Sequence, residues 1–189
     1  AVPKERLVDP KAWGQIELDL FGPFTCRSDV NKRSTKKVWG VVIVDKNSGA
    51  IHCDVVQDYS SQEVVKMMRR FGALRGFPLV VHSDPGSQLE NAAGNLESWF
   101  LTMKNHLEDY ATSSNFEWKI SPADSPWRQG QTEVRIKMIK RLIKVSVGVT
   151  RLTPSELQTV LFEVANLSND RPIGINKCPE ANGTFRVLT

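Results

Sequence analysis

The sequence is poor in the residues that build disulfide frameworks and zinc sites. Three cysteines and three histidines occur among its 189 residues. Cys26, Cys53 and Cys178 are widely separated and show neither CxxC nor Cys/His spacing, so a disulfide framework and a zinc site both lack support. We expect three reduced thiols, as in an intracellular protein.

Long apolar runs are also missing. The longest, VWGVVIV at residues 38–44, is far too short to span a bilayer, and the opening AVPKERLVDP lacks the apolar core of a signal peptide. The sequence contains no P-loop and no GxSxG motif, so the usual signals of nucleoside-triphosphate binding and of serine hydrolases are missing. We expect a soluble chain that does not interact with a membrane.

The overall composition is that of a globular domain. Hydrophobic residues make up 40% of the chain, which is enough for one well-formed core. The formal net charge of +4 and the pI of ≈ 9.0 permit a nucleic-acid partner. Basic residues concentrate in segments 27–37 and 135–144, although a solvated surface is the structural alternative for any such run.

Strand and helix signals alternate along the chain, which predicts an α/β fold. Short apolar or alternating runs indicate strands at 13–21, 38–45, 51–56, 76–83 and 116–121. The turn KNSG joins the second and third of these in an antiparallel hairpin. Helical spacing indicates helices from Ser60, over 93–110, from about Thr132 and from Pro154, with a proline-rich loop over 121–131.

Two of these helices carry strong start signals. Ser60 with Glu63, and Thr153 with Glu156, each form a capping box, and Pro154 occupies a favoured first helical position. Helical spacing then predicts which side chains point inward. In the earlier helix these are Val64, Met68, Phe71 and Leu74 or Arg75, and in the last helix they are Leu157, Val160, Leu161, Val164 and Leu167 or Ser168.

The helix expected from Thr132 combines an acid with a row of cations. Intervals of three and four place one set of side chains on a common face, namely Glu133, Lys137, Lys140, Arg141 and Lys144. The apolar stripe that we expect to pack consists of Val134, Met138, Leu142 and Val145. A basic face suits a phosphate backbone, whose counterions each Lys or Arg displaces. A surface helix with solvated lysines is an equally open interpretation.

Three acids occupy positions that suit a catalytic site. Asp19 lies near the end of the first strand, Asp84 closes the fourth, and Glu133 is expected in the first turn of the basic helix. Sites collect at the carboxyl ends of strands in a central sheet. Three converging carboxylates would hold two ions such as Mg2+, which prefers oxygen ligands. Two such ions clamp an in-line displacement at phosphorus, so the arrangement predicts phosphodiester chemistry.

Each acid also has a structural interpretation. A lone strand aspartate such as Asp19 more often caps a turn or pairs with a neighbouring Arg or Lys. The helix dipole alone favours Glu133 in a first helical turn. Spacing does not separate these interpretations from the catalytic one. Four further acids compete for a role, and of these Asp45 and Asp58 stand at ordinary turn and helix-start positions: Asp45, Asp54, Asp58 and Asp124.

Five segments resemble, in order, the successive blocks of the catalytic core of retroviral and retrotransposon integrases. Four of them are WGQIELDLFGPF, VWGVVIVDKNSGAIHCDVV, GFPLVVHSDPGSQLENA and SPWRQGQTEVRIKMIKRLIK. The fifth, LTPSELQTVLFEVANLSNDRPIG, is similar to the segment that follows the core in BEL/Pao-type retrotransposon integrases. The resemblance covers nearly the whole chain, and the order of the blocks makes it specific.

The resemblance implies an RNase H-like fold, in which helices flank a mixed five-stranded sheet. It also implies a DDE triad of Asp19, Asp84 and Glu133 that binds two Mg2+ or Mn2+ ions. The implied reactions are hydrolysis at the 3′ ends of element DNA and attack of the freed 3′-hydroxyl on target DNA, with water and hydroxyl as nucleophiles. DNA contacts are expected from Arg128, Gln129, Gln131, Lys137, Lys140, Arg141 and Lys144.

The resemblance further predicts the domain organisation and the partners. We expect an N-terminal extension over residues 1–11, the catalytic core over 12–150, and a C-terminal helix and tail of the core over 151–189. The expected partners are element ends, target DNA and further copies of the chain in a homodimer or higher oligomer. An active retroelement would place the protein in the nucleus after a cytoplasmic particle stage. No His-His-Cys-Cys zinc module precedes the core, so we expect weak end processing and poor strand transfer.

Some residues depart from the family pattern. Pro85 stands where many members have Asn, and Leu89 stands where an aromatic residue is common. The segment between Asp84 and Glu133 is longer than in retroviral enzymes and is similar in this respect to BEL/Pao-type members. Two other classes of function therefore stay open. One is a captured, retroelement-derived DNA-binding module without activity, and the other is a different RNase H-like nuclease that cuts hybrid RNA or DNA junctions.

Overall fold

The computed structural model describes residues 11–28, 34–83, 95, 117–120, 126–148, 150–170, 174–177 and 185–188. At residues 120, 126–133, 136, 174–177 and 185–188 it describes the backbone alone. Several predictions fall outside these residues, namely the helix over 93–110 except for residue 95, Cys178, Asp84, Asp124 and the side chain of Glu133.

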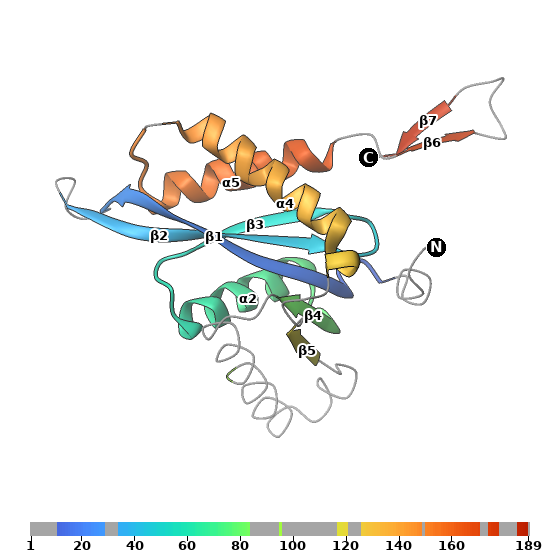
Figure 1. Cartoon of the computed structure of the whole chain (residues 1–189), viewed down its shortest axis with the longest axis horizontal. Coiled ribbons are helices and arrows are strands. Elements are labelled where there is room, and N and C mark those ends of the chain that lie inside the picture. The colour runs from blue at the N-terminus through green and yellow to red at the C-terminus, as the bar shows by residue number, and fades with distance from the viewer. Residues whose placement is uncertain are drawn as a thin grey trace.

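A mixed five-stranded sheet forms the centre of the molecule (Figure 1). Its strands follow the order β3-β2-β1-β4-β5. β1 lies in the middle, antiparallel to β2 and parallel to β4, while β2 pairs antiparallel with β3 and β4 pairs parallel with β5. The five-stranded mixed sheet implied by the resemblance is thereby confirmed. The strands are β1 (Gln15–Arg27), β2 (Thr35–Asp45), β3 (Ile51–Val56), β4 (Val80–Ser83) and β5 (Glu117–Ile120).

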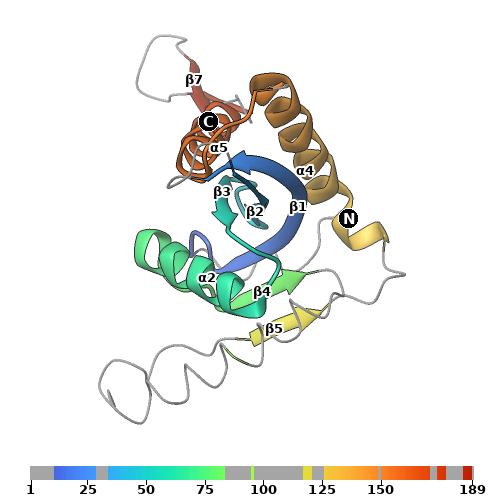
Figure 2. The same cartoon turned by 90° about the vertical axis from the view of Figure 1, so that its left-hand side faces the viewer.

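Helices cover both faces of the sheet, as the end-on view shows (Figure 2). Helix α2 (Ser61–Arg75) packs on one face, and α4 (Pro126–Val147) with α5 (Pro154–Asn169) packs on the other. Alternation along β1 serves both layers, because successive strand residues point to opposite faces. Leu18 belongs to the core cluster on the α2 side, and Phe21 belongs to the cluster on the side of α4 and α5.

Helix α2 follows its sequence signals closely. The Ser60 hydroxyl accepts a hydrogen bond from Glu63 N, as the capping box predicts. The Glu63 carboxylate, however, accepts a hydrogen bond from Gln57 N rather than from the backbone N–H of Ser60. It therefore fixes the segment before the helix instead of completing the capping box. Val64, Met67, Met68 and Phe71 are fully buried. Leu74 and Arg75 are both exposed, so neither alternative for the last position of the predicted row is buried.

Helix α4 begins earlier than the sequence indicates. It starts at Pro126, so the predicted loop over 121–131 is wrong from that residue on. Proline fits the first helical position because the N–H that it lacks would have no helical partner there. Gly130 lies within the helix, where a glycine is tolerated at a cost of about 1 kcal/mol. Glu133 is consequently in the third turn of α4 rather than the first.

The face of α4 that packs is also different from the predicted one. Ile139 and Ile143 are fully buried against the sheet and α5. Val134, Leu142 and Val145 are 66%, 38% and 76% exposed, so the predicted packing stripe is wrong for them, whereas Met138 of the same stripe packs against the core. Periodicity identified apolar rows on this helix but did not determine which row meets the sheet. Contacts with strands far away in the sequence make that choice.

Helix α5 has the predicted start and is bonded to the edge strand β3 near its end. Thr153 and Glu156 form both hydrogen bonds of a capping box, with Pro154 in the first turn. At the other end, the Asn169 side chain accepts from Ile51 N (2.7 Å) and donates to Ile51 O (2.9 Å). A side chain thus takes the place of a neighbouring strand at the first residue of β3.

The inward side of α5 is close to the predicted one. Leu157, Leu161, Val164 and Ser168 are buried, and Leu167 is exposed. Of the two alternatives for the last inward position, Ser168 is therefore the correct one.

A separate antiparallel hairpin is formed by β6 (Gly174–Lys177) and β7 (Phe185–Leu188). Cys26 and Cys53 carry free thiols. No helix in the described ranges is long and apolar enough to cross a bilayer.

The packing face of α4 can be tested with two neighbouring apolar positions. We expect Ile143→Ala to lower the free energy of unfolding by about 2–5 kcal/mol, because it removes a fully buried side chain and leaves a cavity. Val145→Ala, at an exposed position on the same helix, should change it by less than about 0.5 kcal/mol. Equilibrium urea unfolding measures both. Equal losses would contradict the orientation of α4.

A buried histidine on β3 predicts a second measurable effect. His52 is 5% exposed, lies against Phe71 and Phe162, and its Nε2 has no hydrogen-bond partner among the described residues. Burial lowers the pKa of His52 from 6.5 to about 4, with smaller effects of Asp54, Arg75 and Arg70. In the unfolded chain the imidazole takes up its proton near pH 6.5, so the unfolded state binds more protons between pH 6.5 and 4.

Stability should therefore fall as the pH is lowered through that window, by an amount of about 3 kcal/mol from this residue. Above pH 6.5 the contribution of His52 should be constant. His52→Phe removes the titrating group and keeps a ring between the two aromatic neighbours. We expect the difference in unfolding free energy between variant and wild type to grow in favour of the variant from pH 7 to pH 4, measured by urea unfolding. A difference that stays constant with pH would contradict the shift.

Candidate active site

Asp19 lies on β1, on the face of the sheet that α4 and α5 cover. It pairs across the antiparallel ladder with Val42, which belongs to the cluster on that side. Its sequence neighbours Leu18 and Leu20 pack toward α2 instead, as the alternation of a strand requires. The predicted first acid of the site is thus at the centre of the sheet, beneath a helix.

The end of β4 lies directly beside this point. Ser83, the last residue of β4, pairs with Leu18 in the parallel register. Ser83 is buried, and its hydroxyl accepts a hydrogen bond from Trp118 Nε1 of β5 (2.9 Å). The strand end is therefore fixed from both sides. Asp84 follows Ser83 in the sequence and lies outside the described residues, so its predicted position in the site stays a prediction.

Glu133 belongs to the helix that crosses above Asp19. Ile139 and Ile143 attach α4 to the sheet, and the Arg135 guanidinium donates to the carbonyl of Gly49 in the turn between β2 and β3. Gly49 has a positive φ of 74°, a backbone conformation that favours glycine. Seven residues are nearly two helical turns, so positions 133 and 140 lie on one side of α4.

Asp19 forms an ion pair with Lys140 of α4. Lys140 Nζ donates to Asp19 Oδ2 at 2.7 Å, and the two side chains are 40% and 27% exposed. The same ammonium lies 5.9 Å from the centre of the Phe21 ring. The structural interpretation of Asp19, pairing with a nearby Lys, is therefore seen. The same contact shows that the carboxylate faces a position where a cation is stable.

The competing acids have structural roles in the described part of the chain. Asp45 accepts hydrogen bonds from Asn47 N, Ser48 N and the Ser48 hydroxyl, which builds the turn after β2. Asp58 accepts from Ser60 N and the Ser60 hydroxyl just before α2. Asp54 is buried and binds Arg70 and Gln158. All three carboxylates thus bind groups that belong to turns, helix starts or helix contacts of the fold.

One acid beside the candidate site was missed in the sequence. Glu17 is 6% exposed and lies on the same face of β1 as Asp19, with His82 of β4 next to it in the parallel register. The signal was present, because residues two positions apart on a strand share a face. The site is therefore bordered by a second polar row of Glu17 and His82, one step before Asp19 along β1.

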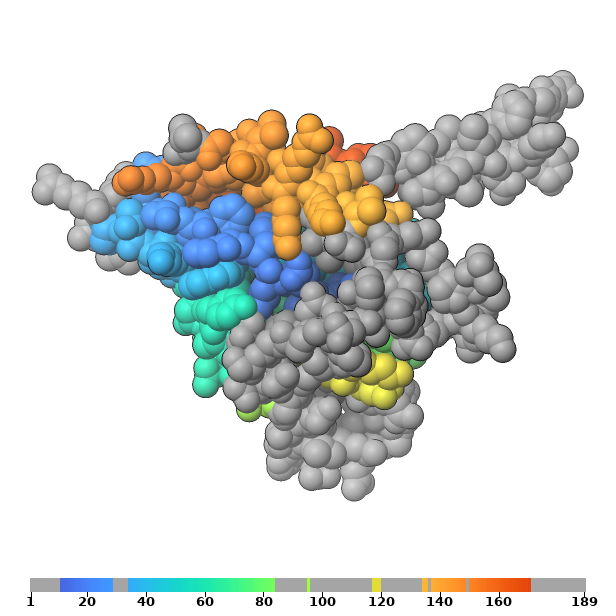
Figure 3. Space-filling view, viewed as in Figure 1, coloured from blue at the N-terminus to red at the C-terminus, as the bar shows by residue number. Residues whose placement is uncertain are grey.

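The cationic face of α4 is exposed beyond the ion pair. Lys137, Arg141 and Lys144 are exposed and Lys140 is half-buried, while the side chains of Arg128, Gln129 and Gln131 lie outside the described residues. The described part of α4 lies on the surface above β1 (Figure 3). A row of exposed cations thus extends from the helix position that contacts Asp19, as the basic stripe of the sequence predicts.

No group of three His, Cys, Asp or Glu side chains that would hold a metal is found among the described residues. Two of the three predicted ligands are missing from that set, so the triad itself stays a prediction. Asp19, the one predicted ligand whose side chain is described, is suited to bind a cation, because its partly exposed carboxylate already binds the ammonium of Lys140. An oxygen ligand of this kind suits Mg2+ or Mn2+.

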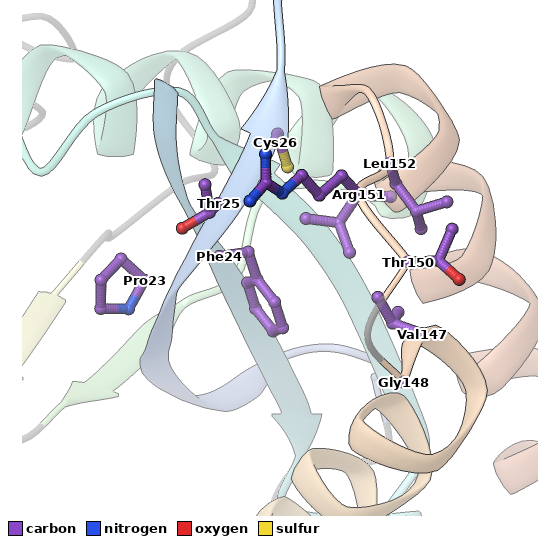
Figure 4. A pocket seen from close by; sticks show the side chains of 10 residues that line it. Pro23, Phe24, Thr25, Cys26, Val147, Gly148, Thr150, Arg151 and Leu152 are labelled. Atoms are coloured by element: carbon purple, nitrogen blue, oxygen red, sulfur yellow. The ribbon is translucent and has the colours of Figure 1, made fainter. Parts of the chain in front are cut away.

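A cavity elsewhere on the molecule does not belong to this site. It has a volume of ≈ 270 Å3 and lies between the second half of β1 and the connection from α4 to α5 (Figure 4). Its lining includes Phe24, Cys26, Val147, Arg151 and Leu152 and contains no acidic residue. The lining therefore offers no carboxylate for a divalent metal.

No family model and no curated protein matches the sequence. Among solved structures, the chain is similar to the catalytic core domain of HTLV-2 integrase, solved in complex with magnesium in a trimeric form. The match has a TM-score of 0.51 and 15% sequence identity, and it covers 81% of this chain and 84% of that chain. The RNase H-like fold implied by the sequence is thereby confirmed. At this identity the likeness concerns the fold alone.

The strength of the Asp19–Lys140 pair can be measured by a double-mutant cycle. We expect a coupling energy of no more than about 1 kcal/mol in unfolding free energy from Asp19→Asn, Lys140→Met and the double variant, because partly exposed ion pairs are weak. The measurement is urea unfolding in EDTA. A coupling above about 2 kcal/mol would mean that the pair is a firm structural contact.

Proposed function

We propose that the protein catalyses polynucleotidyl transfer on DNA, namely 3′-end processing and strand transfer during integration of retroelement DNA. The observation that carries this proposal is the position of Asp19, on the central strand beside the end of β4 and beneath the helix that contains Glu133. The fold shared with an integrase core supports it, and so does the order of the sequence blocks.

In this proposal Asp19, Asp84 and Glu133 hold two divalent ions, Mg2+ or Mn2+. The HTLV-2 integrase core, which has a similar fold, was solved in complex with magnesium, and this supports the choice of metal. Two such ions, when bound, activate the attacking oxygen and stabilise the leaving oxygen of an in-line displacement at phosphorus. The sheet contributes rigidity, because Asp19 lies on its central strand and α4 is attached to it by fully buried isoleucines.

The cations of α4 bind the DNA backbone in this proposal. Lys137, Arg141 and Lys144 are exposed on one helix, and each contact with a phosphate releases counterions. Such contacts position the DNA without reading its sequence. Arg128, Gln129 and Gln131, earlier in the same helix, extend the contact toward the third acid and complete the proposed DNA surface.

Oligomerisation through the core is part of the proposal. The integrase core of similar fold was solved as a trimeric form. We infer a homodimer or higher oligomer that acts on element ends and target DNA. An origin in an active BEL/Pao-type retroelement would place this activity in the nucleus.

The metal-dependent activity can be tested with two acid variants and a matched control. We expect Asp19→Asn and Glu133→Gln to lower the rate of branched-DNA rejoining in Mn2+ by at least about 100-fold. Loss of a residue that only supports a metal ligand lowers activity by up to about 100-fold, and loss of a ligand itself should cost no less. Glu163→Gln, an exposed acid on α5, should retain the rate. Calorimetric titration with Mn2+ should show weakened binding for the first two variants alone.

Other results would support the other classes of function. Cleavage restricted to RNA in hybrids would favour a different RNase H-like nuclease. DNA binding without Mn2+ binding or rejoining would favour a captured DNA-binding module. Rejoining that persists in both Asp19→Asn and Glu133→Gln would contradict the proposed site.

A further inference from the structure

The contact between Lys140 and Asp19 has a consequence for any metal at this carboxylate. The ammonium occupies Oδ2 at 2.7 Å, whereas Mg2+ binds carboxylate oxygens at about 2.0–2.1 Å. Two cations on the same oxygen repel each other strongly at such separations. The ion pair and a metal on that oxygen therefore compete, and each weakens the other.

Lys140 is able to leave Asp19 without any rearrangement of the core. Its helix is fixed by Ile139 and Ile143, both fully buried, so α4 itself stays in place. The lysine side chain is 40% exposed and ends a flexible stem of four carbons. It has a direct path to solvent on the same face as the exposed Lys137 and Lys144, where the proposed DNA surface lies.

We propose that Lys140 is a positioning residue that holds Asp19 in the metal-free protein and moves to a DNA phosphate when a divalent cation takes its place. This inference rests on the proposed function, because it requires a metal at Asp19. One side chain then links two ligands, because the metal competes with Lys140 for Asp19 and the released Lys140 strengthens DNA binding. By linkage, DNA that binds Lys140 strengthens metal binding to the same extent.

The linkage predicts a specific effect on metal affinity. Lys140→Gln removes the competing ammonium, and we expect it to bind Mn2+ up to about fivefold more tightly than the wild type, the limit for a partly exposed pair. Lys144→Gln removes the same charge one turn further along α4, where no contact with Asp19 occurs. Its affinity should stay within about twofold of the wild type, because an exposed charge that does not contact the carboxylate acts on it through water of high dielectric constant. Calorimetric titration with MnCl2 at 0.15 M ionic strength measures all three proteins.

The possible outcomes separate this inference from the proposed function. Equal Mn2+ affinity in wild type and Lys140→Gln, or equal gains in Lys140→Gln and Lys144→Gln, overturns the role of Lys140 while leaving a metal site in place. If Asp19→Asn binds Mn2+ as the wild type does, Asp19 is not a ligand, and the proposed function and this inference fail together.

A second experiment needs no metal. Asp19→Asn weakens the hold on Lys140, so in EDTA we expect it to bind a fluorescently labelled DNA duplex about threefold more tightly than the wild type. The slope of log affinity against log salt should increase by about one phosphate contact. In the Lys140→Gln background the same Asp19→Asn change should give neither effect. Equal gains in both backgrounds would mean that loss of a negative charge, rather than release of Lys140, causes the tighter binding.

Discussion

The packing of Ile139 and Ile143 against the sheet determines how the whole candidate site is arranged. These two side chains are fully buried in the cluster that also contains Val42 and Phe21, so they fix both the position and the rotation of α4 above β1. Lys140 follows Ile139 directly and is therefore held within reach of Asp19. The same rotation turns Arg141 and Val145 to solvent. The surface charge of this helix is thus a result of how its apolar side packs.

The sheet topology places the other parts of the site relative to β1. An antiparallel hairpin on one side and a parallel strand on the other make β1 the point where the sheet changes direction. In such sheets, functional groups collect where a strand ends beside a central strand. β4 ends at Ser83, which is paired to the residue before Asp19 and bound by Trp118. The position of Asp19 therefore depends on contacts formed by segments far apart in the sequence.

Local chemistry explains which predictions from the sequence were confirmed. The capping box of Thr153 and Glu156 lies within four residues, and the turn after β2 is built by Asp45 and its immediate neighbours. Such features depend on nearby groups that the sequence displays. The start of α4 was wrong because Pro126 and Gly130 were interpreted as loop residues, although proline is favoured at a helix start.

The facing of α4 was wrong for a different physical reason. Its apolar residues form two rows around the helix, and periodicity alone does not show which of the two rows is buried. The row with Ile139 and Ile143 packs against the sheet because Val42, Val44 and Phe21 form an apolar surface there on distant strands. Glu17 was missed although it lies two positions before Asp19, because the alternation of a strand shows the shared face but not that the side chain is buried there.

Two carboxylates on this sheet show why the ion pair of Asp19 is compatible with a catalytic role. Asp54 is 3% exposed and binds both Arg70 of α2 and Gln158 of α5, so displacing its partners would open the contact between two helices and the sheet edge. Asp19 is paired with the flexible side chain of Lys140, and both side chains remain partly exposed. Exchange of that lysine for another cation leaves the surrounding core unchanged. The fold thus makes a permanent contact at Asp54 and a replaceable one at Asp19.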